Sequence, residues 1–455
     1  MTGAELIDVG SIGSAMVVGF AVTGRAVTAA LRARGITVVA TDDHPSERMR
    51  TEAASMAVEL LERPDAELLS SRLSGVDAVL PSPGIPAHHP VFDLARQHGV
   101  PVLSEFDLAA AWDERPIVAI TGTDGKTTVT TMVTEMLEES GRRAVACGNT
   151  DTPVVTAIDD PAIEVLVVEA SSFRLGHSQR FRPTVAVWLN FSPDHLDAHG
   201  SLVDYEAAKA RIWSDLDPEV GVAVANATDP VVLANRNPAV RTITFGGDGT
   251  GADATVVDGE LRLPDGTSLL AIDELPRALP HDITNSLAAA VAALAAGADI
   301  EAVRRVLRRF RGLPHRVELV AEIDGVAWFD DSKATTPHAV LAAVAGFDSV
   351  VLIAGGRNKG LDLSVLATAV PPVRAVVAIG ESAAMIAAAF EGRCPTTIVD
   401  TSMTDAVAAA AARAEQGDVV LLSPGCASFD WFRSYSERGE VFAAAVHALD
   451  TGARR

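Results

Sequence analysis

Short apolar runs alternate with segments of helical periodicity along almost the whole chain. The apolar runs lie at 15–20, 36–40, 78–80, 117–121, 165–168, 185–189, 350–354, 375–379, 397–399 and 419–422. Between them, apolar residues recur three or four positions apart, as in Val129, Met132, Val133 and Met136. Buried strands that alternate with amphipathic helices are typical of parallel sheets with helices on both faces. The pattern therefore predicts an α/β protein.

The alternation falls into three segments, so we expect three doubly wound α/β domains. We place the boundaries near Glu114 and at the Gly-Leu-Pro sequence 312–314, which gives domains at 1–113, 114–312 and 313–455. At about 150 residues per domain, the length of 455 residues agrees with this number. The first and last domains are expected to be Rossmann-like, and the central one to be of the P-loop ATPase type.

The first segment carries a loose βαβ nucleotide-binding pattern. Gly24 follows the run 15–20, and Asp42 ends the next run about twenty residues later. The full G-x-G-x-x-G fingerprint is absent, so a tight turn that binds nothing is an equal alternative. The turn Ser82-Pro83-Gly84 follows the run 78–80, at a strand end where open α/β sheets bind ligands.

The strongest chemical motif follows the run 117–121. It has the sequence Gly122-Thr123-Asp124-Gly125-Lys126-Thr127-Thr128 and leads into a helical segment. Glycines let backbone N–H groups close around phosphate oxygens, and the helix N-terminus adds its positive dipole end. Lys126 offers a mobile cation to the β- and γ-phosphates, and the Thr127 hydroxyl can bind Mg²⁺. We predict a nucleotide site here; the alternative is a glycine-rich turn with an incidental lysine.

Further polar residues follow strands of the second segment. Glu169 ends the run 165–168, where a carboxylate is a natural second contact for Mg²⁺. His195 follows the run 185–189 at the same expected sheet edge, although alone it would be a capping or surface histidine. Lys209 lies in a predicted helix and, taken alone, would belong to a solvated face. The residues before Asn285 resemble a helix N-terminal cap.

Strand ends of the third segment also carry polar sequences. They are Asp331-Ser332-Lys333, the glycine-rich loop 355–360 and the loop 423–430.

Composition excludes several partners. The formal net charge is −23, so neither nucleic acid nor an anionic membrane would attract the chain electrostatically. Anionic small molecules would need local positive charge, and all four lysines, Lys126, Lys209, Lys333 and Lys359, lie in the motifs described above.

The same composition predicts a cytoplasmic protein. The three cysteines have no paired spacing and are expected to be reduced thiols. The longest apolar run is well short of the ~20 residues of a membrane span. The acidic N-terminal stretch does not match a secretory signal. No membrane insertion is expected.

Together these sequences resemble the Mur ligase family along nearly the whole chain. Residues 331–335 and 422–430 are most similar to the members that add D-glutamate to UDP-N-acetylmuramoyl-L-alanine. The resemblance implies an ATP-dependent ligase: the substrate carboxylate attacks the γ-phosphate, and the amine of D-glutamate displaces phosphate from the acyl phosphate. It also implies a role in peptidoglycan synthesis, and so in cell wall formation, cell shape and cell division, and a monomer that binds small-molecule substrates.

The resemblance also implies roles for individual residues. Lys126, Thr127 and Glu169 would hold ATP phosphates and Mg²⁺, His195 a second Mg²⁺, and Lys209 would act as an N-carbamate made with CO₂. The remaining nucleotide contacts would be Asn285, Arg316 and Asp331. The uridine-nucleotide substrate would contact Thr23, Gly24, Asp42, Ser82, Pro83, Gly84, Asn149, Ser171 and Arg174. The D-glutamate pocket would comprise Lys333, Thr335, Lys359, Ser428, Phe429 and Tyr435.

The chain departs from the family pattern at several of these places. Arg174 stands where the family usually has a glutamine that contacts the muramoyl substrate, and Gly176 replaces an acid. Asp282 replaces an asparagine, and Asp151 a glycine. Arg174 could supply positive charge to the substrate. Two rival functions remain, a related ligase with another acceptor, such as L-glutamate, and a nucleotide-binding regulator without catalysis.

Overall fold

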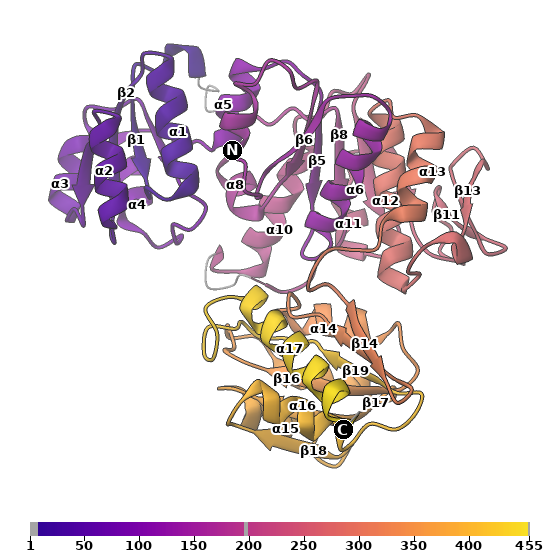
Figure 1. The fold of residues 1–455 in the computed structure, drawn as a ribbon. Coiled ribbons are helices and arrows are strands. Elements are labelled where there is room, and N and C mark those ends of the chain that lie inside the picture. Colours follow the sequence, from indigo (N-terminus) through magenta and orange to yellow (C-terminus); the bar gives the residue numbers. More distant parts are fainter. Residues whose placement is uncertain (1–7, 195–198, 454–455) are drawn as a thin grey trace. The chain divides into compact units, whose positions relative to one another are not determined.

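The computed structural model describes residues 8–194 and 199–453, which form two compact units (Figure 1). Unit 1 comprises the described residues of 1–191, 195–271 and 285–308, and unit 2 comprises 192–194, 272–284 and 309–455. Each unit contains parallel strands flanked by helices, so the predicted α/β class is confirmed. The domain boundaries near 113 and 312 stay predictions.

The first sheet of unit 1 is parallel, with the order β3-β2-β1-β4. Alternate residues of β1 enter two different cores: Ala15 and Val17 pack beside α1 residues, whereas Met16 and Val18 pack beside residues of α3 and α4. Helices therefore cover both faces, as the doubly wound prediction requires. The elements are β1 (Ser14–Val18), β2 (Thr37–Asp42), β3 (Glu59–Glu62), β4 (Ala78–Pro81), α1 (Val22–Ala33), α2 (Glu47–Ser55), α3 (Ala66–Leu73), α4 (Pro90–His98) and α5 (Glu105–Trp112).

The second sheet of unit 1 is also parallel, with the order β10-β9-β8-β5-β7-β6. Strand β5 lies between β7 and β8, so the loops that follow these three strands adjoin at one edge of the sheet. The strands are β5 (Ile117–Thr121), β6 (Ala144–Gly148), β7 (Val165–Glu169), β8 (Val185–Trp188), β9 (Val222–Asn226) and β10 (Arg241–Phe245). The helices are α6 (Lys126–Glu139), α7 (Val154–Ala157), α8 (Ser172–His177), α10 (Leu202–Ala210), α11 (Pro230–Ala234), α12 (Pro280–Ala295) and α13 (Ile300–Arg309).

A small antiparallel sheet completes unit 1. It consists of β11 (Thr255–Val257), β12 (Glu260–Arg262) and β13 (Ser268–Ala271). The sequence pattern did not predict these strands because each is only three or four residues long and contains polar positions.

The sheet of unit 2 has the order β14-β15-β19-β16-β17-β18, and only β14 pairs antiparallel. Leu352 of β16 packs in one core, and Val351 and Ile353 pack in the core on the opposite face. The strands are β14 (Glu318–Ile323), β15 (Val326–Asp330), β16 (Val350–Gly355), β17 (Val373–Ile379), β18 (Thr396–Val399) and β19 (Val419–Leu422). The helices are α14 (Pro337–Val344), α15 (Ala383–Ala389), α16 (Met403–Ala411) and α17 (Tyr435–Ala453).

Two expectations from composition can be compared with the structure. Cys147, Cys394 and Cys426 are free thiols, as expected. Within the described ranges, no helix has both the length and the apolar character that crossing a bilayer requires.

Candidate active site

The phosphate loop joins β5 to α6 in unit 1, as predicted. Gly125 precedes the helix with φ of 82°, and a Cβ there would lie 2.9 Å from Asn285 Oδ1. Both the backbone conformation and the close approach therefore require glycine. Lys126 Nζ donates hydrogen bonds to the carbonyls of Gly122 and Thr123, at 2.8 Å each. The loop thus holds its own cation at the N-terminus of α6.

Asn190 holds the same loop, a role that the sequence analysis did not assign. It lies just after β8, and its Oδ1 accepts hydrogen bonds from the backbone N–H groups of Thr123 and Asp124, at 2.9 Å each. Its Nδ2 donates to the Asp124 carbonyl. The sheet order that places β8 beside β5 creates this contact, and a sequence without that order cannot reveal it.

Glu169 is a buried carboxylate at the end of β7, and one of its oxygens has no partner. Oε1 accepts a hydrogen bond from Asn149 Nδ2 at 2.9 Å, while Oε2 is buried without a hydrogen bond in the described part of the chain. An unpaired buried carboxylate oxygen is costly unless it binds a cation. Carboxylate and hydroxyl oxygens are ligands that Mg²⁺ prefers. Glu169 and the half-buried Thr127 therefore fit the predicted metal site.

Lys209 is fully buried, contrary to the solvated face that its helix alone suggests. Its exposed fraction is 1%, and Nζ donates to the Gly122 carbonyl at 2.6 Å. The ammonium also lies 4.7 Å from the ring centre of Tyr205, whose hydroxyl contacts Thr123 Oγ1. Lys126 and Lys209 thus meet at one carbonyl of the phosphate loop. His195, predicted as a metal ligand, lies outside the described residues.

The predicted uridine-nucleotide residues of the first sheet lie together at its strand ends. Asp42 Oδ2 accepts from the Phe20 N–H at 2.7 Å, and Ser82 Oγ donates to the Gly19 carbonyl at 2.7 Å. A Cβ on Gly24 would lie 1.9 Å from the same carbonyl, so only glycine fits there. Pro83 and Gly84 continue the turn after β4. The tight-turn alternative and the nucleotide prediction both agree with this geometry.

Arg174 occupies the centre of a buried network in unit 1. Its Nε donates to Glu105 Oε1 at 2.5 Å, Nη1 to Asn149 Oδ1 at 3.0 Å and Nη2 to Thr23 Oγ1 at 3.1 Å. Ser171 caps the N-terminus of α8 with its side chain. Burial raises the pKa of the Glu105 carboxyl, and Arg174 opposes that rise. Glu105 was not predicted, because it lies 69 positions before Arg174 in the sequence.

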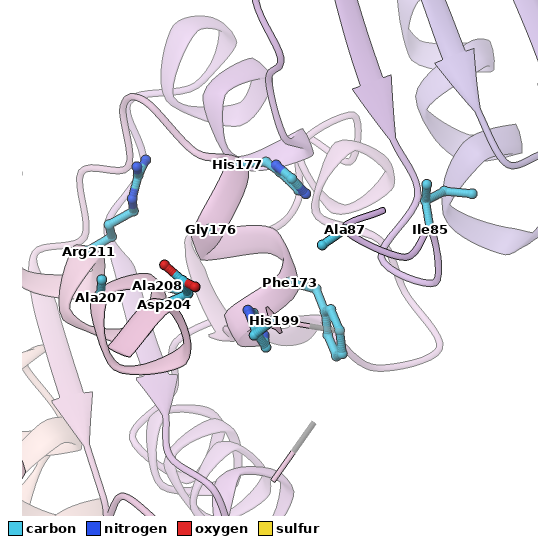
Figure 2. A pocket seen from close by; sticks show the side chains of 10 residues that line it. All are labelled: Ile85, Ala87, Phe173, Gly176, His177, His199, Asp204, Ala207, Ala208 and Arg211. Atoms are coloured by element: carbon cyan, nitrogen blue, oxygen red, sulfur yellow. The ribbon is translucent and has the colours of Figure 1, made fainter. Parts of the chain in front are cut away.

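A pocket of about 250 Å³ opens beside this network (Figure 2). Phe173 stacks on His199 at a ring-centre distance of 5.2 Å, and Gly176 lies on the pocket wall. Burial, aided by Arg211 and His199, lowers the pKa of His177 to about 4, so this imidazole is neutral at pH 7. The pocket wall also includes Ile85, Ala87, Asp204, Ala207 and Ala208.

In unit 2, Asp330 and Asp331 mark the carboxyl end of β15. Burial raises the pKa of Asp331 to about 7, against the opposing effects of Ser423 and Arg316. Ser423 Oγ, which follows β19, donates to Asp331 Oδ2 at 2.7 Å. Asp331 and Arg316 therefore lie in one unit, whereas Asn285 belongs to unit 1.

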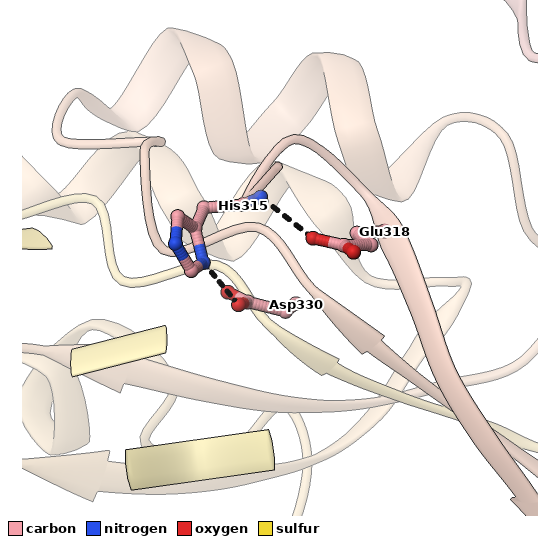
Figure 3. Close-up of side chains that lie close together, drawn as sticks. All are labelled: His315, Glu318 and Asp330. Atoms are coloured by element: carbon pink, nitrogen blue, oxygen red, sulfur yellow. Dashed lines mark hydrogen bonds and ion pairs between the residues drawn. The ribbon is translucent and has the colours of Figure 1, made fainter. Parts of the chain in front are cut away.

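His315, Glu318 and Asp330 form a cluster of possible metal ligands (Figure 3). The backbone N–H of His315 donates to Glu318 Oε2 at 2.9 Å, and the ring nitrogen Nδ1 of His315 lies 2.6 Å from Asp330 Oδ2. A Cβ on Gly439 would lie 2.2 Å from His315 Nδ1. Because these hydrogen bonds occur within the cluster itself, they account for its geometry without a metal.

The residues predicted for D-glutamate lie on three loops and one helix start of unit 2. Lys333 Nζ lies 3.7 Å from the ring centre of Tyr435, which begins α17. Burial raises the pKa of the Tyr435 phenol, and Lys333 opposes it strongly enough that the net shift is downward. Ser428 is buried, Thr335 and Lys359 are half-buried, and Phe429 is exposed. The structure thus shows a direct contact between two of these residues, Lys333 and Tyr435.

Arg438 supports these loops and was not among the predicted site residues. It is 1% exposed; Nε donates to Ser332 Oγ at 2.9 Å, Nη2 to the Ser332 carbonyl and Nη1 to the Cys426 carbonyl. Burial lowers the pKa of this guanidinium to about 10, so it stays charged at pH 7. An arginine inside a helix ordinarily faces solvent, and only the packing of α17 on the sheet reveals this role.

Comparison with known proteins assigns the middle and C-terminal parts of the chain to one family. Residues 120–293 match the model of the Mur ligase middle domain, and residues 315–426 match the Mur ligase glutamate ligase domain. The UDP-N-acetylmuramoylalanine–D-glutamate ligase of Frankia casuarinae is 43% identical, with 96% of this chain and 94% of that protein covered. The ligase of the same name from Thermobifida fusca is 39% identical, with 95% and 98% covered.

Solved structures agree with this fold. The UDP-N-acetylmuramate-alanine ligase of Thermotoga maritima has a TM-score of 0.58 at 18% identity, covering 96% of this chain and all of that one. A pseudomurein peptide ligase of type C from Methanothermus fervidus has a TM-score of 0.59 at 17% identity, with the same coverage. At these identities the likeness concerns the fold alone.

Proposed function

The chain belongs to the Mur ligase family, and from this we propose that it joins D-glutamate to UDP-N-acetylmuramoyl-L-alanine with hydrolysis of ATP to ADP and phosphate. It is an ATP-dependent ligase of peptidoglycan synthesis. The observation that carries the proposal is the assembly of Lys126, Lys209 and Asn190 around the phosphate loop, with Glu169 buried at the next strand end. The sequence match to the D-glutamate ligases named above covers nearly the whole chain.

The residues of unit 1 fit the activation of a carboxylate by ATP. We propose that Lys126 contacts the phosphates and that the N-terminus of α6 offers backbone N–H groups to them. Thr127 Oγ1 and Glu169 Oε2 are the oxygens that would hold Mg²⁺, which supplies positive charge to the γ-phosphate during transfer. A second Mg²⁺ at His195 remains part of the proposal. The first product is an acyl phosphate, formed as the substrate carboxylate displaces ADP.

The proposal includes an N-carbamate on Lys209. A neutral ε-amine attacks CO₂, the new N–C bond forms, and one proton leaves to solvent; a guanidinium does not react in this way. Burial of Nζ at the phosphate loop supports the assignment, because burial penalises a charged ammonium more than the neutral amine that reacts with CO₂. The carbamate would instead present two oxygens beside the phosphate loop.

The residues of unit 2 fit an amino acid with two carboxylates. Lys333 and Lys359 supply two ammonium groups on the loops that follow β15 and β16, and Ser428, Thr335 and Tyr435 supply hydroxyls. Phe429 offers an exposed aromatic face. Asp331 and Arg316, with Asn285 of unit 1, are proposed nucleotide contacts. We also propose that the enzyme works in the cytoplasm as a monomer.

An ATP-dependent phosphate-release assay tests the function. UDP-N-acetylmuramoyl-L-alanine is supplied with D-glutamate, with L-glutamate, or with no amino acid. We expect phosphate release that depends on both substrates and on the D isomer. A preference for L-glutamate would favour the related-ligase alternative. The absence of release with either isomer would favour the non-catalytic regulator and overturn the proposal.

A further inference from the structure

Glu169 is held by a chain of side chains that passes through Arg174. Asn149 Nδ2 donates to Glu169 Oε1 at 2.9 Å, and Asn149 Oδ1 accepts from Arg174 Nη1 at 3.0 Å. The amide of Asn149 is therefore used at both ends, and Arg174 decides which way it faces. With this amide reversed, two donors would face each other and two oxygens would face each other.

The guanidinium of Arg174 is fixed by two further bonds. Nε donates to Glu105 Oε1 at the start of α5, and Nη2 donates to Thr23 Oγ1 in the first turn of α1. The other Glu105 oxygen accepts from the Val154 N–H, the first residue of α7. Both side chains are almost fully buried, at 6% and 1% exposed. The guanidinium is thus already paired with the Glu105 carboxylate, so its charge is not free to bind a substrate anion.

From these contacts we infer that Arg174 is a positioning residue. Through Asn149 it orients Glu169, so that Oε2 is left for the proposed Mg²⁺, and it links this carboxylate to Thr23, a proposed uridine-nucleotide contact in α1. The inference rests on the proposed function, since it takes Glu169 as the metal carboxylate. It replaces the expectation that Arg174 contacts the substrate directly. Glu105 is its necessary partner, because a buried guanidinium without a carboxylate would be strongly unfavourable.

The test measures metal binding and not turnover. Mn²⁺ is titrated by electron paramagnetic resonance into the whole protein saturated with ADP, without either ligation substrate. Arg174→Lys keeps the positive charge for Glu105, but one ammonium cannot serve Glu105, Asn149 and Thr23 together. We expect the Mn²⁺ dissociation constant to rise about 10-fold or more, the range for residues that orient metal ligands. Glu169→Gln should abolish this binding.

Two further variants separate positioning from simple stability. Arg174→Met with Glu105→Gln removes both buried charges, which should preserve folding yet still weaken Mn²⁺ binding. Arg115→Lys is the matched control: Arg115 also makes several hydrogen bonds, to Asp113 and to the carbonyls of Ile158 and Ile163, but it lies before β5, at the opposite end of that strand from Gly122. It should leave Mn²⁺ affinity unchanged.

Wild-type Mn²⁺ affinity in both Arg174 variants would overturn the inference, as would binding that survives Glu169→Gln. The measured Mn²⁺ affinity does not depend on which amino acid the enzyme uses as its acceptor. If the wild type bound Mn²⁺ in the expected Arg174-dependent way but ligated no D-glutamate, only the proposed function would fail.

Discussion

The lysines that we assign to the reaction are held by different parts of the chain in the two units. In unit 1, Lys126 and Lys209 both donate to the backbone carbonyl of Gly122, within the phosphate loop itself. In unit 2, Lys333 lies against the ring of Tyr435, 102 positions later, and the loop before Lys333 is fixed by Arg438. Lys126 is held by carbonyls of its own loop and therefore depends on local sequence. Lys209 lies 87 positions from Gly122, so Lys209 and Lys333 both depend on the packing of separate segments of the chain.

The largest effect is expected at Lys209, the buried lysine at the phosphate loop of unit 1 that we propose reacts with CO₂. Lys209→Arg keeps the charge, but a guanidinium has no amine to form a carbamate and is too large for a fully buried site. We expect kcat to fall about 100-fold or more. Lys209→Ala should partly recover when a small carboxylate such as acetate is added. Steady-state kinetics measure the turnover of both variants. Near-normal turnover of Lys209→Arg would contradict a carbamate on Lys209.

Arg438 tests the distant support in unit 2. Arg438→Met leaves the buried carbonyls of Ser332 and Cys426 without their donor, which should lower the free energy of unfolding by about 3 kcal/mol. Arg433→Met is the control, since Arg433 is 91% exposed and its ion pair with Glu437 contributes little. Urea unfolding measures both variants. Equal stability of the two would show that the loops do not depend on Arg438.

Asp331 gives unit 2 a pH dependence of its own. Its pKa of about 7 in the folded state exceeds that of an unfolded aspartate, so folding favours the protonated form. Stability from this group is fully present near pH 4 and is lost as the pH rises through 7. Asp331→Asn should therefore gain stability relative to wild type between pH 4 and 8, on the order of 4 kcal/mol.

Thermal unfolding across this pH range is the measurement. The exposed Asp362→Asn in the same unit should keep the wild-type profile. A parallel profile for Asp331→Asn and wild type would contradict the raised pKa.

His177 should show the opposite sign in unit 1, with the smallest effect. Its folded-state pKa of about 4 means that the native state resists protonation, so stability from this group is lost as the pH falls from about 6.5 to 4. His177→Phe can keep the stacking on Phe92 and should lose less stability at pH 5, by on the order of 1 kcal/mol. Unfolding at pH 5 and 7 measures this, with exposed His88→Phe as control. An equal loss in His177→Phe and wild type would refute it.

The sequence predicted features that lie within one continuous segment. The apolar runs predicted the strands β1, β2, β5, β7 and β8 closely, and the phosphate loop followed from residues 121–128. Glu169 could be named because it ends a strand. These predictions need only the preference of each segment for a strand or a helix.

Features that join distant segments could not be predicted. Asn190 reaches the phosphate loop because β8 pairs with β5, and Arg438 reaches Ser332 because α17 packs on the sheet. Glu105 and Arg174 form an ion pair that neither residue suggests alone. Each contact depends on strand order and helix packing, which a single sequence does not state.

We propose that the chain activates the carboxylate of UDP-N-acetylmuramoyl-L-alanine by phosphorylation and then joins the activated acyl group to D-glutamate. The most direct test uses this substrate with ¹⁸O in its carboxylate, together with ATP and D-glutamate, and analyses the products by mass spectrometry. We expect the D-glutamyl product and one ¹⁸O atom in the released phosphate, because one carboxylate oxygen leaves with the phosphoryl group. Product without label in phosphate, or no D-glutamyl product at all, would contradict it.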